Sequence, residues 1–285
     1  MSEESTVRTW PELDLPRGLL PNTYLAANAL VRCAVFSTLE YAGAAQRPVI
    51  TEPLPLATMA PYRMTQVAGV RLSQSDANVF FWLLSRAYRG GAPTGNATVF
   101  FKCGEALEAL GRKRGGKTDV LLDTSLQRLS QADFTCEYLG VVRRTRLLSH
   151  VERCENPDKP YDYRITIAAS AAELLNDGEW LILPGTVRKQ LGSDPLAQGL
   201  YAFYASHKSA FPMLTDTLKQ LMGRESMQDS KWRQALQKAL ATVKAVSGWR
   251  QCELAQGGRF LGKVVVQKTP PPRVRATTPV ESVAS

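Results

Sequence analysis

The sequence has little of what most membrane proteins and enzymes need. It contains no run of 18 apolar residues, so we expect no helix that spans a membrane. Its two histidines, His150 and His207, are far apart and fit neither the H-x-H nor the H-E-x-x-H spacing of histidine-bound metal sites. The G-x-S-x-G motif of serine hydrolases is absent as well. We therefore expect no catalytic residue, no metal and no cofactor, and the protein is not expected to be an enzyme.

Cysteine is scarce and follows no pairing pattern. The five cysteines are odd in number, and no two stand at C-x-x-C spacing, which argues against a disulfide framework and against a zinc cluster. The N-terminal stretch MSEESTVRTW is polar and carries two glutamates, whereas a secretory signal has a basic segment followed by an apolar one. Both observations predict a protein of the reducing cytoplasm.

Basic residues are in clear excess. The chain has 35 lysines and arginines against 26 aspartates and glutamates, which gives a formal charge of +9 and a pI near 9.4. Such an excess favours a polyanionic partner, of which nucleic acid is the commonest. Because many basic proteins bind no polyanion, charge alone leaves DNA binding open.

The 285 residues divide by pattern into four segments. Residues 1–21 are rich in proline and acidic residues and are interpreted as an arm. Residues 268–285 contain three consecutive prolines and no apolar period, which predicts a disordered tail. Between them we predict two domains, residues 22–170 and residues 171–267.

The first predicted domain begins with helices. Residues 22–38 form a mostly apolar block that we expect to start as a helix, and the four prolines of residues 43–61 leave little room for helix there. A long helix is predicted after Ser73, which can cap it together with Asp76 in a capping box.

The rest of this domain is predicted to contain both strands and helices. A short strand at residues 98–101 and a short helix at residues 105–110 lead to a longer helix, which Thr118 can cap and whose leucines repeat at i, i+4 and i+7. The period then changes to two, which predicts strands. These lie at residues 134–138, 143–151 and 161–167.

The second half repeats this order of elements. Asp194 caps a helix that starts at Pro195, and a short helix at residues 214–221 ends at Gly223. A turn then leads to a long helix with an apolar stripe, followed by two strands that pair across a Gly-Gly turn. Helix, strand, helix, turn, long helix and hairpin is the layout of a winged helix-turn-helix. We therefore predict an α+β fold of two tandem winged-helix domains with disordered termini.

Residues 111–118, GRKRGGKT, fit the phosphate-loop pattern G-x-x-x-x-G-K-[ST] letter for letter. A phosphate loop needs a buried strand directly before it, but the preceding EALEAL consists of strong helix formers. Asp119 would also place a negative charge beside a bound triphosphate. A phosphate-loop NTPase is therefore the less favoured hypothesis, and a basic turn between two helices the favoured one.

Three groups of residues are candidates for contacting DNA. The glycine-rich turn brings four cations within six positions and lets the backbone approach a phosphate. A basic hairpin after the first long helix can lie on the DNA, or can be a charged edge that prevents aggregation. In the second half, the turn and the outer face of the long helix can read bases in the major groove, or form a solvated surface. The candidates are Arg112, Lys113, Arg114 and Lys117; Arg143, Arg144 and Arg146; and Arg224, Ser226, Ser230, Lys231, Gln234 and Lys238.

Four stretches of the chain resemble the TrfA family of plasmid replication initiators. They are LPRGLLPNTYLAANALVRCAVFS (15–37), LGRKRGGKTDVLLDTSLQRLSQADF (110–134), LYAFYASHKSAFP (200–212) and LKQLMGRESMQDSKWRQALQKAL (218–240). The match is one of pattern, and the third stretch is the most diagnostic. The first stretch departs from the family at Val35, where the family usually has leucine.

The resemblance implies a bacterial protein with two tandem winged-helix domains. It implies binding of short direct repeats (iterons) in the double-stranded DNA of a plasmid origin, and opening of an AT-rich region. It further implies contacts with the host replicative helicase and host initiator proteins, and a switch between dimers and DNA-binding monomers. A transcriptional repressor on the same fold remains an alternative, because both classes bind repeated sites.

Overall fold

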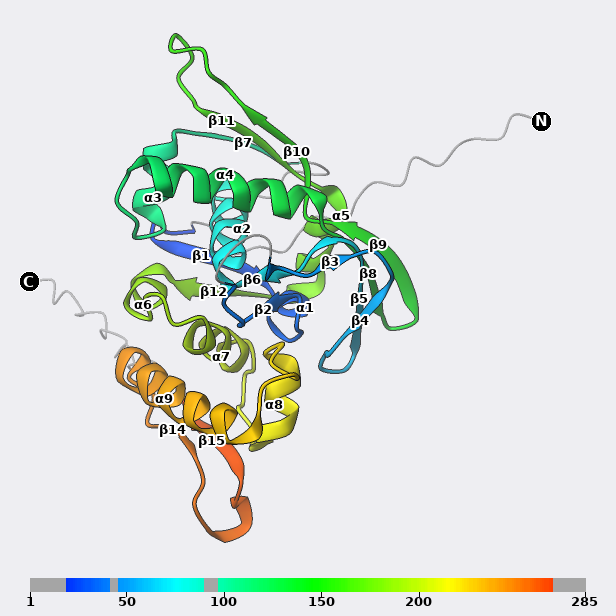
Figure 1. The fold of residues 1–285 in the computed structure, drawn as a ribbon, viewed down its shortest axis with the longest axis vertical. Coiled ribbons are helices and arrows are strands. Elements are labelled where there is room, and N and C mark those ends of the chain that lie inside the picture. Colours follow the sequence, from blue (N-terminus) through cyan, green and yellow to red (C-terminus); the bar gives the residue numbers. More distant parts are fainter. Residues whose placement is uncertain (1–18, 42–45, 90–96, 269–285) are drawn as a thin grey trace, which may run out of the picture.

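The computed structural model describes residues 19–41, 46–89 and 97–268 (Figure 1). The predicted arm (residues 1–21) and tail (residues 268–285) lie almost wholly outside these ranges, so their disorder stays a prediction. Within them the chain forms helices and several small sheets, which confirms the predicted α+β class. None of the helices in the described ranges is both long and apolar enough to cross a membrane.

The first half is built around a central helix, α2 (Gln74–Ala87). Ser73 and Asp76 form the predicted capping box, in which the Ser73 N–H donates to the Asp76 carboxylate at 2.9 Å. Phe80, Leu83 and Leu84 recur at helical spacing and are almost wholly inaccessible to water. Helix α2 therefore forms the centre against which the rest of the half packs.

The elements after α2 lie close to their predicted places. They are strand β7 (Ala97–Phe101), helix α3 (Cys103–Ala109) and the long helix α4 (Gly116–Gln131), which buries the predicted leucine stripe. Helix α4 begins two residues before Thr118, so the prediction that Thr118 is its N-cap is wrong. The Thr118 hydroxyl instead donates to the Gly115 carbonyl at 2.7 Å.

Strand β7 pairs with a long hairpin that projects from the top of the molecule in Figure 1. The hairpin consists of β10 (Leu148–Arg153) and β11 (Tyr163–Ile167). The sheet order is β10–β11–β7. The strand before the two helices thus pairs with the second strand of the hairpin that follows them.

The second half repeats this topology with different residues. Helix α7 (Pro195–Ala205) corresponds to α2, and Asp194 caps it as predicted, its carboxylate accepting the Ala197 N–H at 3.0 Å. The elements that follow are β13 (Met213–Leu214), α8 (Thr215–Leu221), α9 (Asp229–Ser247), β14 (Gln251–Leu254), η3 (Gly258–Phe260) and β15 (Lys263–Gln267). Their sheet order, β13–β15–β14, matches that of the first half and supports the predicted duplication.

A second sheet of the first half was only partly predicted. Its strands are β3 (Val49–Ile50), β4 (Leu54–Leu56), β5 (Tyr62–Val70), β8 (Asp133–Tyr138) and β9 (Val141–Arg146). The prediction of one strand at residues 143–151 is wrong, because β9 and β10 belong to different sheets. The residue between them, Leu147, is fully buried, and alternation in the sequence does not show such a break.

The predicted helix at the start of residues 22–38 is also wrong. Residues Thr23–Ala27 form strand β1, which pairs antiparallel with β12 (Trp180–Pro184), and helix α1 spans only Asn28–Val31. Strand β2 (Phe36–Ser37) then runs parallel to β6 (Leu72–Ser73). The block is apolar on all sides, so its pattern does not distinguish a buried strand from a buried helix.

The two halves pack against each other. Along the chain, the segment that connects them contains α5 (Ala169–Ala172), the 3₁₀ turn η2 (Glu173–Gly178), β12 and α6 (Gly185–Gln190). Pairing of β1 with β12 and a continuous apolar core join the halves. The predicted boundary at residue 170 stays a prediction, and the β1–β12 pair crosses it.

Candidate nucleic-acid interface

Both halves carry the same turn before their long helix. Helices α3 and α8 each span seven residues and are followed by a glycine in the left-handed conformation, Gly111 (φ +70°) and Gly223 (φ +64°). The next N–H groups, of Arg112 and Arg224, return to the carbonyls five residues earlier at 2.7 and 2.9 Å. This Schellman cap ends the short helix and directs the chain into the turn. The Gly-Arg pair at both caps is a sequence signal of the duplication that the sequence analysis missed.

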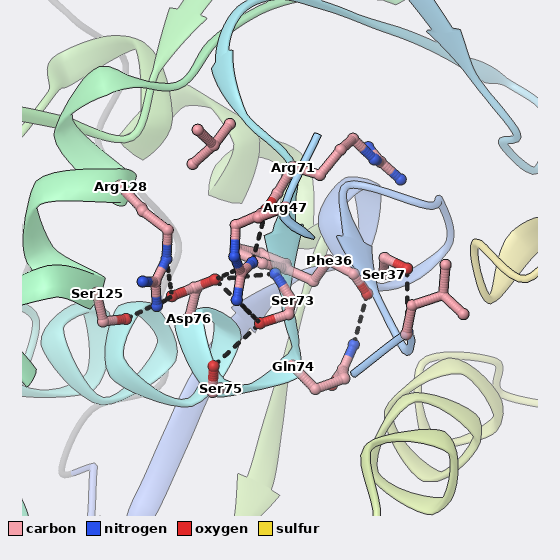
Figure 2. A network of polar contacts seen from close by, with 12 residues as sticks. Phe36, Ser37, Arg47, Arg71, Ser73, Gln74, Ser75, Asp76, Ser125 and Arg128 are labelled. Atoms are coloured by element: carbon pink, nitrogen blue, oxygen red, sulfur yellow. Dashed lines mark hydrogen bonds and ion pairs between the residues drawn. The ribbon is translucent and has the colours of Figure 1, made fainter. Parts of the chain in front are cut away.

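Helix α4 is fixed against α2 by a buried carboxylate (Figure 2). Asp76 is wholly buried and accepts hydrogen bonds from Ser125 (2.6 Å) and from Nε of Arg128 (3.0 Å), both on α4. Arg47, in the segment before β3, forms an ion pair with the same carboxylate at 3.3 Å. Charge-assisted bonds of this kind hold their geometry tightly. The outer face of α4 is therefore presented in a fixed orientation.

Helix α9 is anchored in a different way. The Trp232 side chain is almost fully buried, and its indole N–H donates to the Thr215 carbonyl at the start of α8, at 3.2 Å. At the surface, Lys219 of α8 pairs with Asp229 at the first position of α9, at 2.6 Å. The two helices of the second helix-turn-helix thus hold each other at a fixed angle.

The polar candidates of the second half lie together. The predicted apolar stripe of α9 is buried, and the side chains opposite it face solvent. Ser226, in the preceding turn, is exposed too. The structure therefore places the candidates Ser230, Lys231, Gln234 and Lys238 on the outer face of α9, with the exposed Ser226 in the turn before it. Their contact with bases stays a prediction.

The turn between α3 and α4 is basic but not uniform. Lys113, Arg114 and Lys117 are exposed, and Arg114 lies 3.8 Å from the Asp119 carboxylate, a contact that solvent screens. Arg112 instead folds inward and is half-buried. Three of the four cations of this turn are therefore exposed on the outer surface.

The outer face of α4 carries side chains that the sequence analysis did not single out. Val120 and Leu121 are 64% and 46% exposed, although both are aliphatic. Gln127 is exposed two turns further along the same helix. Aliphatic side chains can contact the thymine methyl group in the major groove, and glutamine can read adenine. In the sequence, the helical positions of these residues outside the leucine stripe were the signal that could have predicted their exposure.

The three hairpin arginines lie on the hairpin predicted after the first long helix, which is formed by β8 and β9, but this hairpin belongs to another sheet than the winged-helix layout requires. Arg143, Arg144 and Arg146 are on β9, in the five-stranded sheet, and not on the hairpin that pairs with β7. Arg146 binds Asp133 at 2.8 Å, and Arg143 binds Glu173 at 3.0 Å. Arg144 is more exposed and lies 3.7 Å from Asp133. The interpretation of this hairpin as the DNA-binding wing is therefore not supported by its place in the fold.

The hairpin in the wing position is β10–β11. It carries Arg153, Lys159 and Arg164, all exposed. Arg153 lies 3.4 Å from Asp123 of α4, so the end of β10 next to the connecting loop is tied to the long helix. The corresponding hairpin of the second half, β14–β15, carries the exposed Arg259. Sequence reasoning missed the residues of β10–β11 because it merged β9 and β10 into one strand.

Arg224 joins the halves. Its Nε donates to the Thr38 hydroxyl at 2.8 Å, and its Nη2 donates to the Thr38 carbonyl at 2.6 Å. Ser37 extends this seam, its hydroxyl donating to the Gly223 carbonyl at 3.1 Å. The structure thus gives Arg224 a role in positioning the second helix-turn-helix, while a contact of Arg224 with DNA stays a prediction.

The phosphate-loop hypothesis lacks its structural context. The residues directly before Gly111 form helix α3, where such a loop needs a strand. The hydroxyl of Thr118, which would bind the metal of a bound nucleotide, donates to backbone carbonyls of its own turn. The glycine-rich turn is therefore the connection of a helix-turn-helix.

No protein-family model matches the sequence, and no curated protein is similar to it in sequence. Among solved structures, the chain is similar to a selenomethionine derivative of domains 2 and 3 of RctB, with a TM-score of 0.54 and 16% identity over 80% of this chain and 94% of that one. A second crystal structure of RctB domains 2–3 gives a TM-score of 0.50 and 16% identity, over 73% and 86% of the two chains. At this identity the likeness concerns the fold alone. The chain therefore has the fold of two consecutive RctB domains.

Proposed function

We propose that the protein is a replication initiator that binds repeated double-stranded DNA sites at an origin. One observation carries the proposal: two anchored helices, α4 and α9, follow the same Schellman-capped turn in the two halves, and each turns one face to solvent. The fold shared with domains 2 and 3 of RctB supports it, because RctB is a replication origin initiator. The net charge of +9 suits a polyanionic partner.

In this proposal each half places its long helix in a major groove, whose width admits an α-helix. Phosphate contacts from Lys113, Arg114 and Lys117 fix the register in the first half. Lys231 and Gln234 read base edges in the second half. Because the seam holds the halves together, α4 and α9 would engage two neighbouring segments of one duplex.

The finer parts of the proposal rest on the resemblance to the TrfA family. We infer that the repeats are iterons of a plasmid origin, and that binding promotes opening of an AT-rich region. The host replicative helicase and host initiator proteins are the inferred partners, together with a second copy of the chain in a monomer–dimer switch. The likeness to RctB supports the initiator class without singling out this family. No enzymatic activity and no cofactor form part of the proposal.

Selection of bound duplexes from a random pool tests DNA recognition. We expect enrichment of one short sequence. The triple variant Lys113→Ala, Arg114→Ala, Lys117→Ala should then bind that sequence more weakly, with a salt slope reduced by about 0.9 for each phosphate that it no longer neutralises. Lys208→Ala, which removes an exposed charge outside both helix-turn-helix units, is the control. Equal affinity of the triple variant and the control would contradict the proposal for the first half.

Replication supplied in trans separates an initiator from a repressor. A plasmid that carries the selected repeats but lacks its own initiator gene should replicate only in cells that produce this protein. Repression of a promoter with the same repeats, without replication, would favour the alternative of a transcriptional repressor.

A further inference from the structure

A cavity at the seam between the halves has basic walls. It has a volume of about 270 Å³ and lies among the turn after α3, helix α6 and the loop from α6 to α7. Three of its lining side chains are cationic: Arg112, Arg188 and Lys189. Among the described residues that line it, none is acidic. Asp194, next to the lining residue Ser193, directs its carboxylate to the Ala197 N–H and does not line the cavity.

Arg188 is a buried charge with neutral partners. Its side chain is 2% exposed and donates to the amide oxygens of Asn78 (2.9 Å) and Gln74 (3.4 Å) and to the Gln198 carbonyl (3.3 Å). Burial lowers the pKa of Arg188 to about 10, so the group stays protonated at neutral pH. A buried charge without a counter-ion is unfavourable, and a bound anion would offset that.

Arg112 differs from its counterpart in the other half. Arg224 follows the same Schellman glycine, and its guanidinium is held by Thr38 at 2.6 and 2.8 Å. Arg112 is also half-buried, but no described residue forms a hydrogen bond or an ion pair with its guanidinium. The guanidinium lines the seam cavity instead. The duplicated turn therefore has its arginine hydrogen-bonded by the protein in one half, whereas in the other half the described residues give the arginine only the electrostatic attraction of Asp76 and Tyr24.

The aliphatic part of Lys189 packs against the glycine of the same turn. A Cβ atom on Gly111 would lie 3.2 Å from Cγ of Lys189, so the aliphatic part of the lysine covers the glycine of the turn. The left-handed φ of Gly111 and this contact both favour glycine there. Lys189, which is itself exposed, is thereby held beside the cavity that it lines together with Arg112 and Arg188.

We propose that the seam cavity binds a phosphate group. Three cations and the Ser193 hydroxyl suit a compact, multiply charged anion, and the volume of about 270 Å³ is slightly below the about 300–1,000 Å³ of pockets for drug-sized ligands. Two sources share this chemistry: a backbone phosphate of DNA lying on the neighbouring basic turn, and free phosphate or a small phosphorylated molecule. The first source rests on the proposed function, whereas the second does not. Since the walls come from both halves, the ligand would hold the seam closed.

The first arm of the test uses inorganic phosphate and the full chain without DNA. Titration calorimetry at constant ionic strength, balanced with chloride, should show saturable binding to the unchanged protein. Arg112→Gln and Lys189→Gln should each weaken it about tenfold or more, since each removes a charge-assisted contact. Lys208→Gln, which removes an exposed charge elsewhere, should leave it unchanged. Circular dichroism confirms that the variants fold.

The second arm measures the salt dependence of binding to the selected DNA. If the cavity takes a backbone phosphate, Arg112→Gln reduces the salt slope by about 0.9. An unchanged slope together with phosphate binding in the first arm identifies a free phosphate site. No saturable phosphate binding together with an unchanged slope overturns the proposal. Failure of the unchanged protein to bind any DNA would sink the proposed function, while the first arm would still decide on the cavity.

Discussion

The carboxylate of Asp76 shows how one side chain can set the orientation of a whole helix. It is wholly buried, belongs to α2, and receives Ser125 and Arg128 of α4 as well as Arg47. Removing its charge leaves two largely buried arginines without their partner. A buried pair broken in this way typically costs about 3–5 kcal/mol.

We therefore expect Asp76→Asn to lower the free energy of unfolding by about 3–5 kcal/mol in urea denaturation. Asp158→Asn, in an exposed loop, serves as the control and should change it little. A loss no larger than that of the control would show that the network does not hold α4.

The pKa of His207 makes stability depend on pH. The ring follows α7, and its Nδ1 lies 2.8 Å from the Phe203 carbonyl. Burial lowers the pKa of His207 below its ordinary value of 6.5, and the nearby Arg32 and Lys268 act in the same direction. The unfolded chain therefore takes up a proton more readily than the folded chain. The contribution to stability is full above pH 6.5 and is lost as the pH falls from there through the lower folded value.

We expect the unchanged protein to lose more stability between about pH 7.5 and about pH 5 than His207→Asn does. Urea denaturation at the two pH values measures this difference. Equal losses in the two proteins would mean that other groups account for the pH dependence.

The outer face of α9 should read sequence. Gln234→Ala should relax the preference at one base position by about 1–3 kcal/mol, the value of a good bidentate contact. Lys113→Ala should instead weaken binding to all duplexes. Gln190→Ala, at the exposed end of α6, is the matched control for Gln234. A selected sequence that is unchanged for Gln234→Ala would remove this residue from the interface.

At the scale of elements, a comparison of two glycines distinguishes the cost of backbone strain from the cost of a steric clash. Gly69 of β5 (φ +87°) and Gly140 (φ +79°) are both in the left-handed region. A Cβ atom on Gly69 would lie 2.6 Å from the Gln131 carbonyl oxygen at the end of α4, whereas one on Gly140 would meet nothing within 4 Å. Strand β5 and helix α4 approach each other closely only because Gly69 lacks a side chain.

Gly140→Ala should therefore lose about 1–2 kcal/mol, the strain of a left-handed residue. Gly69→Ala should lose clearly more, because backbone atoms must also move. Chemical denaturation of both variants measures the difference. If the two losses are equal, the approach of β5 to α4 is looser than the structure indicates.

Local signals predicted the helices well. Helix α7 starts at the predicted Asp194–Pro195 pair, and α9 buries the predicted stripe, because capping and helical period act within a few residues. Strand β1 was missed because its partner β12 lies far along the chain. The break between β9 and β10 was missed because alternation continues across the two sheets.

The candidate site likewise has parts that could be predicted from the sequence and parts that could not. The exposed face of α9 followed from the helical period alone. The directions of Arg112 and Arg224 did not, because the segments that surround them, α6 and the residues near Thr38, come from elsewhere in the chain. The ion pairs of Arg143 and Arg146 likewise depend on Glu173 and Asp133, whose places only the fold determines.

At the scale of the molecule, the halves should unfold together. The β1–β12 pair, the bond from Arg188 to Asn78 and the bonds from Arg224 to Thr38 all cross between them. We expect one transition in calorimetry, with equal calorimetric and van't Hoff enthalpies. A Cβ atom on Gly199 would lie 2.6 Å from Cγ2 of Thr38, so Gly199→Ala should lower the temperature of that whole transition. Two separate transitions would show that the halves are independent.

The pairing of β1 with β12 also has a consequence for synthesis on the ribosome. Translation proceeds at about 5–20 residues per second, so the nascent chain exposes the apolar β1 for roughly 8 to 30 s before Trp180 follows Ala27. During that interval β1 has no partner strand, and its unpaired backbone groups can pair with another chain. A chaperone must therefore bind β1, or the growing chain must bury it. A fragment that stops at residue 170 never receives its closing strand. Such a fragment should aggregate under conditions in which the chain of 285 residues stays in solution.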